Sequence, residues 1–278
     1  MHLTDSQVFY KIDVWSYINS TGGSDFIMKQ TGEYVSINNT KKTEKPNEDF
    51  CICDNENGIY IVLDGVSRDN IDGKYPNPSP AVQVTEIFAK SAHKFISDAL
   101  KHNVENYIAL IKDSMLFGNK CIADFNSMGI YSFAPGTVGI VMIVRDTVAY
   151  YGFIGDCTCK VVRSDSSTIF TRRQTENVHK YKSLYTADEI RNHICNNIDH
   201  PAGYGVLNGA SGASDFIELG QFTILEGEKI MLYTDGFEEV IDSRSPNQLY
   251  ELSLLEAKEL SMPTGDEYID DRTLLIIS

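Results

Sequence analysis

The chain has 278 residues, and 42% of them are hydrophobic, so it can bury a substantial core and is not an intrinsically disordered protein. Lys and Arg number 24 against 39 Asp and Glu, and the formal net charge of −15 argues against nucleic acid or an anionic membrane as a partner. No apolar run approaches the roughly 18 residues of a membrane-spanning helix, and the N-terminus has no signal-peptide pattern.

The six cysteines indicate a reducing, cytoplasmic location, since none of them forms a C-x-x-C pair. Two C-x-C pairs, Cys51 with Cys53 and Cys157 with Cys159, fall in strand-like segments. Side chains two positions apart in a strand face the same side. We therefore interpret these cysteines as small buried side chains rather than as metal ligands or redox centres.

The first strand signals follow a stretch rich in aromatic residues. We interpret residues 1–33 as an N-terminal extension that packs on a body formed by residues 34–278. Strands are expected at 34–37, 50–53 and 59–63. The dipeptide Asn57-Gly58 between the last two strands predicts a tight hairpin.

Two helices are predicted next. Ser79-Pro80 is typical of a helix start, with serine as the N-cap and proline at the first helical position. Apolar residues then recur at steps of three and four to about residue 102. The same spacing over residues 107–125 predicts a second helix, although Gly118 weakens its middle. Two such helices in tandem form a helical hairpin.

From Pro135-Gly136 onward the sequence is typical of β-structure. Thr186 and Glu189 form the pattern of a capping box at the start of a helix. Strands gather at both ends of the chain and most neighbours look antiparallel, so we predict one α+β domain with helices packed on sheets. The expected elements are strands at 137–144, 148–154, 158–163, 167–171, 216–224, 229–234 and 273–277, and helices over 186–198 and 246–260.

Acidic residues lie at the ends of several predicted strands. Glu48-Asp49 and Asp270-Asp271 each precede a strand, whereas Asp64-Gly65 and Asp235-Gly236 each follow one. Carboxylates that meet at one place repel each other, and a pair of divalent cations would relieve that repulsion. Glycine would let a backbone carbonyl approach the ion as well. Asp-Gly is also a common turn dipeptide, so residue chemistry alone leaves a turn and a metal site about equally open.

Six motifs, in this order, resemble the metal-dependent protein phosphatases of the phosphatase 2C type, and their bacterial members in particular. They span about residues 34–278, nearly the whole chain. The resemblance implies an α+β fold, a four-layer α-β-β-α sandwich whose central pair of mostly antiparallel sheets is flanked by helices. The motifs are KPNEDF, YIVLDGVS, GTVGIVMIV, FIGDCTCKV, IMLYTDGFEEV and IDDRTLLII.

The resemblance also implies a centre for two Mn²⁺ or Mg²⁺ ions. Asp64 would bridge the two ions, and the backbone carbonyl of Gly65 would bind one of them. Asp235 and Asp270 would bind the other; Asp270 is preferred to its neighbour because the family's ligand lies three residues before a threonine, here Thr273.

Three further acidic positions complete the implied site. Asp156, in the Gly-Asp motif, matches a residue that helps to bind a third, weaker metal ion. Glu48 and Asp49 would hold metal-bound waters or complete the coordination. The residues implied to act in catalysis are Asp49, Asp64 and Asp235.

Two positions depart from the family pattern. Where many members have an arginine that contacts the substrate phosphate, this chain has Glu44, and Lys42 or Lys45 could substitute as a point charge. Where many eukaryotic members have a histidine after the first Asp-Gly, this chain has Val66, as bacterial members often do.

The implied function is a serine/threonine phosphoprotein phosphatase in signalling, paired with a kinase. It would hydrolyse its substrate by direct attack of a water bridging the two ions, without a phosphoenzyme. Two alternatives stay open, because a fold does not fix a function. One is a pseudophosphatase that serves as a regulatory binding module, and the other is a phosphoesterase for small molecules.

Overall fold

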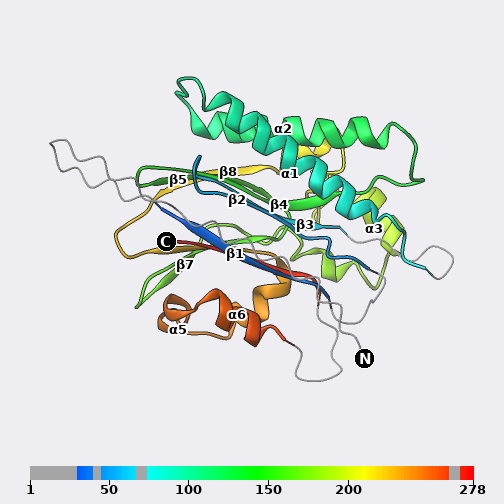
Figure 1. Ribbon diagram of the computed structural model, residues 1–278. Helices are drawn as coiled ribbons and strands as arrows, with labels where there is room; N and C mark the ends of the chain where they lie inside the picture. The colour runs from blue at the N-terminus through cyan, green and yellow to red at the C-terminus, as the bar shows by residue number, and fades with distance from the viewer. Residues whose placement is uncertain (1–29, 40–44, 67–73, 263–269) are drawn as a thin grey trace, which may run out of the picture.

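The computed structural model describes residues 30–39, 45–66, 74–262 and 270–278 (Figure 1). Residues 1–29 of the predicted N-terminal extension lie outside these ranges, as do Lys42 and Glu44.

Two five-stranded sheets form the centre of the molecule, and every strand pair in them is antiparallel. We call the sheet that begins with β2 the upper sheet and the other the lower sheet, as they lie in Figure 1. The upper sheet has the order β2 (Phe50–Asp54), β3 (Ile59–Gly65), β4 (Thr137–Arg145), β5 (Val148–Ile154) and β8 (Glu218–Thr223). The lower sheet has the order β1 (Gly32–Ile37), β10 (Arg272–Ile277), β9 (Lys229–Tyr233), β6 (Thr158–Val162) and β7 (Ser167–Ile169).

Helices cover both outer faces of this pair (Figure 1). The long helices α1 and α2 pack on the upper sheet, and the short helices α5 and α6 lie below the lower one. The predicted four-layer α-β-β-α sandwich is thereby confirmed. The helices are α1 (Pro80–Ala99), α2 (Tyr107–Asn126), α3 (Ala187–His193), α4 (Glu238–Asp242), α5 (Pro246–Glu251) and α6 (Leu254–Leu260), with 3₁₀ turns at Val178–Lys180, Ser211–Phe216 and Asp235–Phe237.

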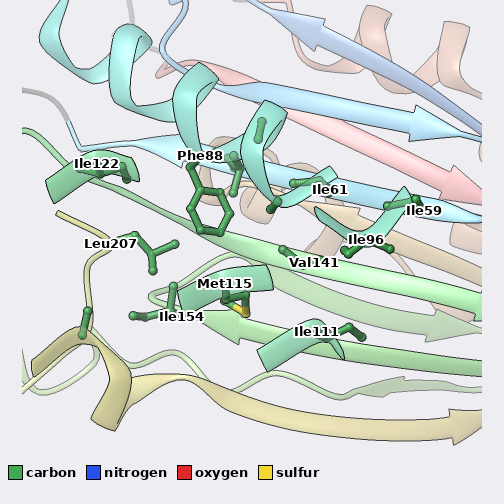
Figure 2. Close-up of a cluster of buried hydrophobic side chains, with 14 of the residues drawn as sticks. Ile59, Ile61, Phe88, Ile96, Ile111, Met115, Ile122, Val141, Ile154 and Leu207 are labelled. Carbon is green, nitrogen blue, oxygen red and sulfur yellow. The ribbon is translucent and has the colours of Figure 1, made fainter. Parts of the chain in front are cut away.

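Strand β3 shows how the sequence builds these layers. Ile59, Ile61 and Leu63 face the helices and join the core under α1 and α2 (Figure 2). Tyr60 and Val62 face the opposite way and join the core between the sheets. Because successive strand residues point to opposite faces, a strand buried on both sides must be apolar throughout.

Local signals in the sequence account for several element ends. The Ser79 hydroxyl accepts a hydrogen bond from Val82 N at 3.3 Å and caps α1. The predicted hairpin joins β2 to β3, with Gly58 at a φ of 55°. Thr186 and Glu189 form the predicted capping box of α3. These three predictions are confirmed.

The α1–α2 hairpin explains the glycine in the middle of α2. A Cβ on Gly118 would lie 2.6 Å from Cδ2 of Phe88. The glycine therefore costs helix propensity but lets the large side chain from α1 pack directly on the backbone of α2.

Three expectations differ from the structure. The helix predicted over 246–260 is two helices, because the chain becomes extended at Leu252 and Ser253 caps a new helix by accepting from Glu256 N at 3.2 Å. The helix predicted over 186–198 ends at His193, before the left-handed residue Asn196. The third difference is helix α4, which follows Asp235-Gly236 and for which the sequence pattern predicted no helix. In the part of the chain described, no helix has both the length and the apolar character to cross a membrane.

Candidate metal centre

The predicted acidic residues come from strand ends that meet at one end of the sandwich. The start of β2 lies beside the end of β3, because Phe50 pairs with Leu63. The start of β10 lies beside the end of β9, because Leu274 pairs with Tyr233. The end of β5 leads through Asp156 into β6, which belongs to the other sheet and also lies beside β9. Antiparallel pairing thus gathers segments that are far apart in the sequence.

The alternation of the strands turns two of these carboxylates inward. Cys51 of β2 and Val62 of β3 contribute to the core between the sheets. Asp49 and Asp64 each lie two positions further along the same strand faces, so they extend that layer toward its open end. A strand that is apolar over its length thereby finishes on a carboxylate between the two sheets.

Asp49 connects the two sheets. It is 8% exposed, and its Oδ2 accepts a hydrogen bond from the Thr234 hydroxyl at 2.8 Å. The oxygen of that hydroxyl accepts from Thr273 N at 2.9 Å, which fixes the start of β10 against the end of β9. Burial, followed by the charge of Asp271, raises the pKa of Asp49 well above its ordinary value, and the hydrogen bond from Thr234 opposes the shift.

Asp64 and Asp235 lie within electrostatic reach of the other carboxylates. Burial raises the pKa of Asp64 well above its ordinary value, and the charges of Asp49 and Asp235 add to the effect. Burial raises the pKa of Asp235 to about 6, with further contributions from Asp156 and Asp270. Each carboxyl group therefore resists ionisation, first because it is withdrawn from water and second because its neighbours are negative. This combination is expected at a cation-binding site.

The glycines of both Asp-Gly pairs sit where a neighbouring backbone passes closely. A Cβ on Gly65 would lie 2.6 Å from the carbonyl oxygen of Glu48, and one on Gly236 would lie 2.1 Å from that of Asp271. Neither glycine has a left-handed φ, so its conformational freedom is not what these positions use. Each one instead makes room for a second acidic motif, so a turn alone does not explain them.

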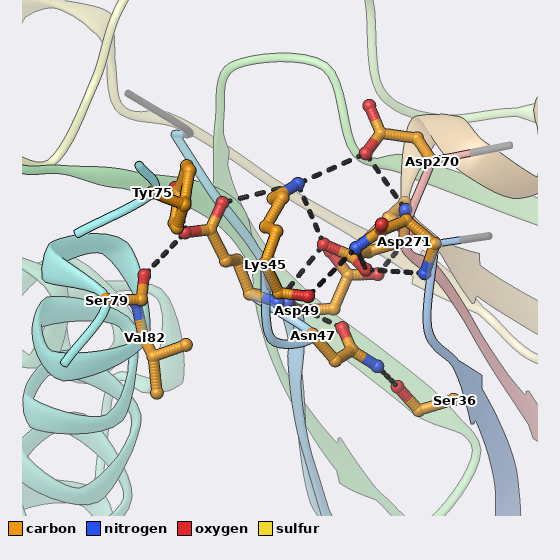
Figure 3. Close-up of polar contacts among 12 residues, drawn as sticks. Ser36, Lys45, Asn47, Asp49, Tyr75, Ser79, Val82, Asp270 and Asp271 are labelled. Atoms are coloured by element: carbon orange, nitrogen blue, oxygen red, sulfur yellow. Dashed lines mark hydrogen bonds and ion pairs between the residues drawn. The ribbon is translucent and has the colours of Figure 1, made fainter. Parts of the chain in front are cut away.

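Lys45 lies inside the acidic cluster (Figure 3). Its side chain is 2% exposed, and its Nζ lies 2.9 Å from Asp271 Oδ2, 3.3 Å from Glu48 Oε2 and 3.3 Å from Asp270 Oδ1. Burial alone would lower the pKa of Lys45, but the three carboxylates outweigh it and raise that pKa. The structure therefore gives Lys45 three carboxylate partners, and the substrate-phosphate role of Lys42 or Lys45 stays a prediction.

Glu48 is also held by protein groups (Figure 3). It is 1% exposed, and its Oε1 accepts hydrogen bonds from the Tyr75 hydroxyl and, at 2.5 Å, from the Ser79 hydroxyl. Its backbone N–H donates to Asp271 Oδ2 at 3.2 Å. Glu48 thus ties the start of α1 to the two strand ends that carry the cluster.

Asp156 is positioned by the segment that follows β7. The Thr175 hydroxyl donates to Asp156 Oδ2 at 3.0 Å, and the neighbouring Gln174 accepts from Gly155 N at 2.9 Å. Arg173 of the same segment reaches across to Glu238, with Nη1 2.8 Å from Oε2. Sequence reasoning missed Arg173, since nothing local distinguishes it from its neighbour Arg172.

Carboxylate oxygens are the ligands that Mg²⁺ and Mn²⁺ prefer, so the donor set fits these ions. Asp49 is buried and Asp64 half-buried among like charges, and divalent cations would neutralise them. Among the described residues, however, no three His, Cys, Asp or Glu side chains converge closely enough to hold an ion as they stand. The ligand roles of Asp49, Asp64, Gly65, Asp156, Asp235 and Asp270, and the supporting role of Glu48, stay predictions.

The cysteines take no part in this chemistry. All six are free thiols, and Cys157 and Cys159 are buried. Burial raises the pKa of both thiols, which keeps them protonated. The interpretation as small buried side chains is confirmed for Cys157 and Cys159, whereas Cys51 and Cys53 are only half-buried.

No protein-family model and no curated protein sequence matches the chain. Solved structures do. The serine/threonine phosphatase PstP/Ppp from Mycobacterium tuberculosis superposes with a TM-score of 0.64 at 17% identity, covering 90% of this chain and 98% of that one. The PstP catalytic domain with two manganese ions gives 0.60 at 16%, covering 90% and 98%. The serine/threonine phosphatase of S. agalactiae gives a TM-score of 0.61 at 16% identity, covering 89% of this chain and 98% of that one. At such identities the likeness establishes the fold, which is that of bacterial metal-dependent serine/threonine phosphatases.

Proposed function

We propose that the protein is a Mn²⁺- or Mg²⁺-dependent phosphatase that hydrolyses phosphoserine and phosphothreonine in proteins. The observation that carries this proposal is a set of wholly or partly buried carboxylates from both sheets at one end of the sandwich, whose pKa values are raised by burial and then by one another's charge. The fold shared with serine/threonine phosphatases supports it. A phosphoprotein substrate and a partner kinase belong to the same proposal.

Asp64, Asp235 and Asp270 would hold the two ions, with Asp156 beside a third. When bound, the ions supply a water that is nucleophilic at neutral pH and stabilise charge on the phosphoryl oxygens. Asp49 would keep its orientation through the hydrogen bond from Thr234. In this proposal the carboxylates serve to hold the ions, and the phosphoryl group would pass directly to water.

The test is phosphate release from an aryl phosphate and from a phosphothreonine peptide, with Mn²⁺ or with EDTA. We expect turnover only with Mn²⁺, and a loss of at least about a thousandfold in Asp235→Asn. A wild type without manganese-dependent turnover would refute the proposal. Turnover of the aryl ester alone would indicate a small-molecule phosphoesterase, and full activity in Asp235→Asn would refute the assignment of that ligand.

One observation favours the second candidate, a regulatory binding module without catalysis. Lys45 already neutralises part of the acidic cluster, so this part needs no metal ion to be stable. Such a module would bind its partner equally well in EDTA, and the same assay distinguishes it by the absence of turnover.

The substrate phosphate needs a cationic partner beside the carboxylates, and Arg173 is suited to the task. Its charge acts on Asp235, its side chain is 37% exposed, and the contact with Glu238 engages a single Nη atom. A guanidinium has five donors and can bind phosphate through two of them.

We therefore expect Arg173→Ala to raise KM for the aryl phosphate by about ten- to a hundredfold. Arg172→Ala is the matched control, because Arg172 is the adjacent arginine, is 67% exposed and pairs with Glu218 at 2.7 Å. The KM values of both variants are measured by steady-state kinetics at saturating Mn²⁺. Equal KM values for the two variants would show that Arg173 does not bind the phosphate.

A further inference from the structure

Lys45 contacts a carboxylate that a metal ion would also be expected to bind. Its ammonium touches Asp270, which is a predicted ligand, as well as Glu48 and Asp271, which hold the surrounding strands. The ammonium is buried, since the Lys45 side chain is 2% exposed, and water therefore screens its charge little on the side of Glu48 and Asp271. A fixed positive charge therefore already lies within the cluster.

Asp270 differs from the other two partners of this lysine. Its side chain is 48% exposed, whereas those of Glu48 and Asp271 are 1% and 4% exposed. Asp271 Oδ1 also accepts from the backbone N–H and the side-chain amide of Asn39, each at 2.9 Å. Asp270 Oδ1 accepts from the backbone N–H of Asp271 at 2.9 Å, but Asp270 is the most exposed of the three and therefore the partner that can turn toward an ion, while Glu48 and Asp271 keep the lysine in place.

We propose that Lys45 is a built-in counter-ion which competes with the second divalent ion for Asp270. In the metal-free protein its ammonium holds this carboxylate, and binding of the ion at Asp235 and Asp270 requires the Lys45–Asp270 contact to break. Lys45 also stays close enough to repel the incoming cation. The second ion consequently binds more weakly than the first. This inference rests on the proposed metal-dependent function.

The first experiment observes the lysine directly in the full-length wild type. Protein carrying ¹⁵N-lysine is titrated with diamagnetic Mg²⁺ after treatment with EDTA, and the side-chain ammonium signals are followed by NMR. The signal of Lys45 is identified by its loss in Lys45→Arg, which keeps the charge. We expect it to shift as Mg²⁺ saturates the protein, while the ammonium signal of Lys160 stays in place.

The second experiment measures Mn²⁺ binding by isothermal titration calorimetry for the wild type and Lys45→Met. We expect the methionine variant to bind the second ion at least about tenfold more tightly, because the competing charge is gone. In EDTA its Tm should fall by about 5–10 °C, since the carboxylates have lost their counter-ion, and Mn²⁺ should restore most of that loss.

Lys160→Met is the matched control. Lys160 is also buried, with Nζ 2.9 Å from Asp242 Oδ1, but its partner is not a predicted ligand. Its replacement should lower the Tm in EDTA without changing either Mn²⁺ affinity. An affinity gain in both variants would mean that overall charge, and not Lys45 itself, sets the binding.

The outcomes separate this inference from the proposed function. Metal binding and turnover with an unmoved Lys45 signal and no affinity gain in Lys45→Met would overturn the inference alone. Binding of the second ion in Lys45→Met but not in the wild type would support the inference, because Lys45 would then exclude that ion completely. No metal binding in either protein would refute both. If Lys45→Met fails to fold, the Mg²⁺ titration of the wild type still decides.

Discussion

Replacing Asp64 with asparagine is expected to abolish manganese-dependent phosphate release and to make the metal-free protein more stable. The Asp64 carboxylate is half-buried near Asp49 and Asp235, and desolvation followed by their charges raises its pKa well above the ordinary value of 3.8. At neutral pH the folded protein must therefore either hold an unfavourable charge or bind a proton there, whereas the unfolded chain hydrates the charge freely. Asparagine removes this cost, and we expect a higher free energy of unfolding than that of the wild type.

The same reasoning gives a pH dependence with a defined sign. A carboxyl whose pKa is higher in the folded state binds its proton more tightly there, so it destabilises the protein as pH rises through the interval between the two pKa values. For Asp235 that interval runs from 3.8 to about 6. In EDTA, the advantage of Asp235→Asn over the wild type should be absent below about pH 4 and complete above about pH 6.

Urea unfolding in EDTA at several pH values checks both expectations. Asp113→Asn is a suitable control, because Asp113 lies exposed on α2, far in sequence from the acidic motifs. If Asp64→Asn were less stable than the wild type at pH 7 in EDTA, the Asp64 carboxylate would not be a source of repulsion. Added Mn²⁺ should reverse the order, since it stabilises only the protein that retains its ligands.

The second large effect is expected from Gly236→Ala. The added Cβ would lie 2.1 Å from the Asp271 carbonyl oxygen and 2.8 Å from Arg272 Cγ. The backbone cannot move away easily, because Thr234 N donates to Thr273 O at 3.0 Å and pairs the two segments. We expect a loss of at least about 3 kcal/mol in the free energy of unfolding, together with weaker Mn²⁺ binding.

Gly129→Ala provides the contrast for this substitution. Gly129 has a φ of 67°, and no atom lies within 4 Å of a Cβ added there. Alanine at this position meets only an unfavourable backbone conformation and should cost about 1 kcal/mol. Equal losses in the two variants, measured by urea unfolding, would show that close approach of the β10 segment is not what requires Gly236.

Features that depend on neighbouring residues could be predicted from the sequence. Ser79-Pro80, Asn57-Gly58 and the Thr186–Glu189 box each fix an element end through contacts over a few positions. The carboxylates at strand ends could also be located, because each acidic motif stands directly beside an apolar run of strand length. The strand pattern predicted only an α+β domain. The four-layer arrangement was predicted from the order of the six motifs, which resembles that of a known family.

Features that depend on tertiary pairing could not be predicted in this way. The three carboxylate partners of Lys45 include Asp270 and Asp271, from the other end of the chain, and no local pattern links them. Arg173 acquires its place beside Asp235 only when the segment after β7 packs against Glu238. The start of helix α6 could have been predicted from Ser253 and Glu256, which form a capping pattern. A single helix over 246–260 was predicted instead, because the apolar spacing continues across Ser253.

The order of strands in the lower sheet has a consequence for how the protein is made. Strand β10 lies between β1 and β9, although it follows both in the chain. During synthesis β1 therefore emerges long before its partner strand β10. Ile37 can pair with Arg272 only after the residues between them have been made. The acidic centre can thus assemble only late in synthesis, because Asp270 and Asp271 directly precede β10.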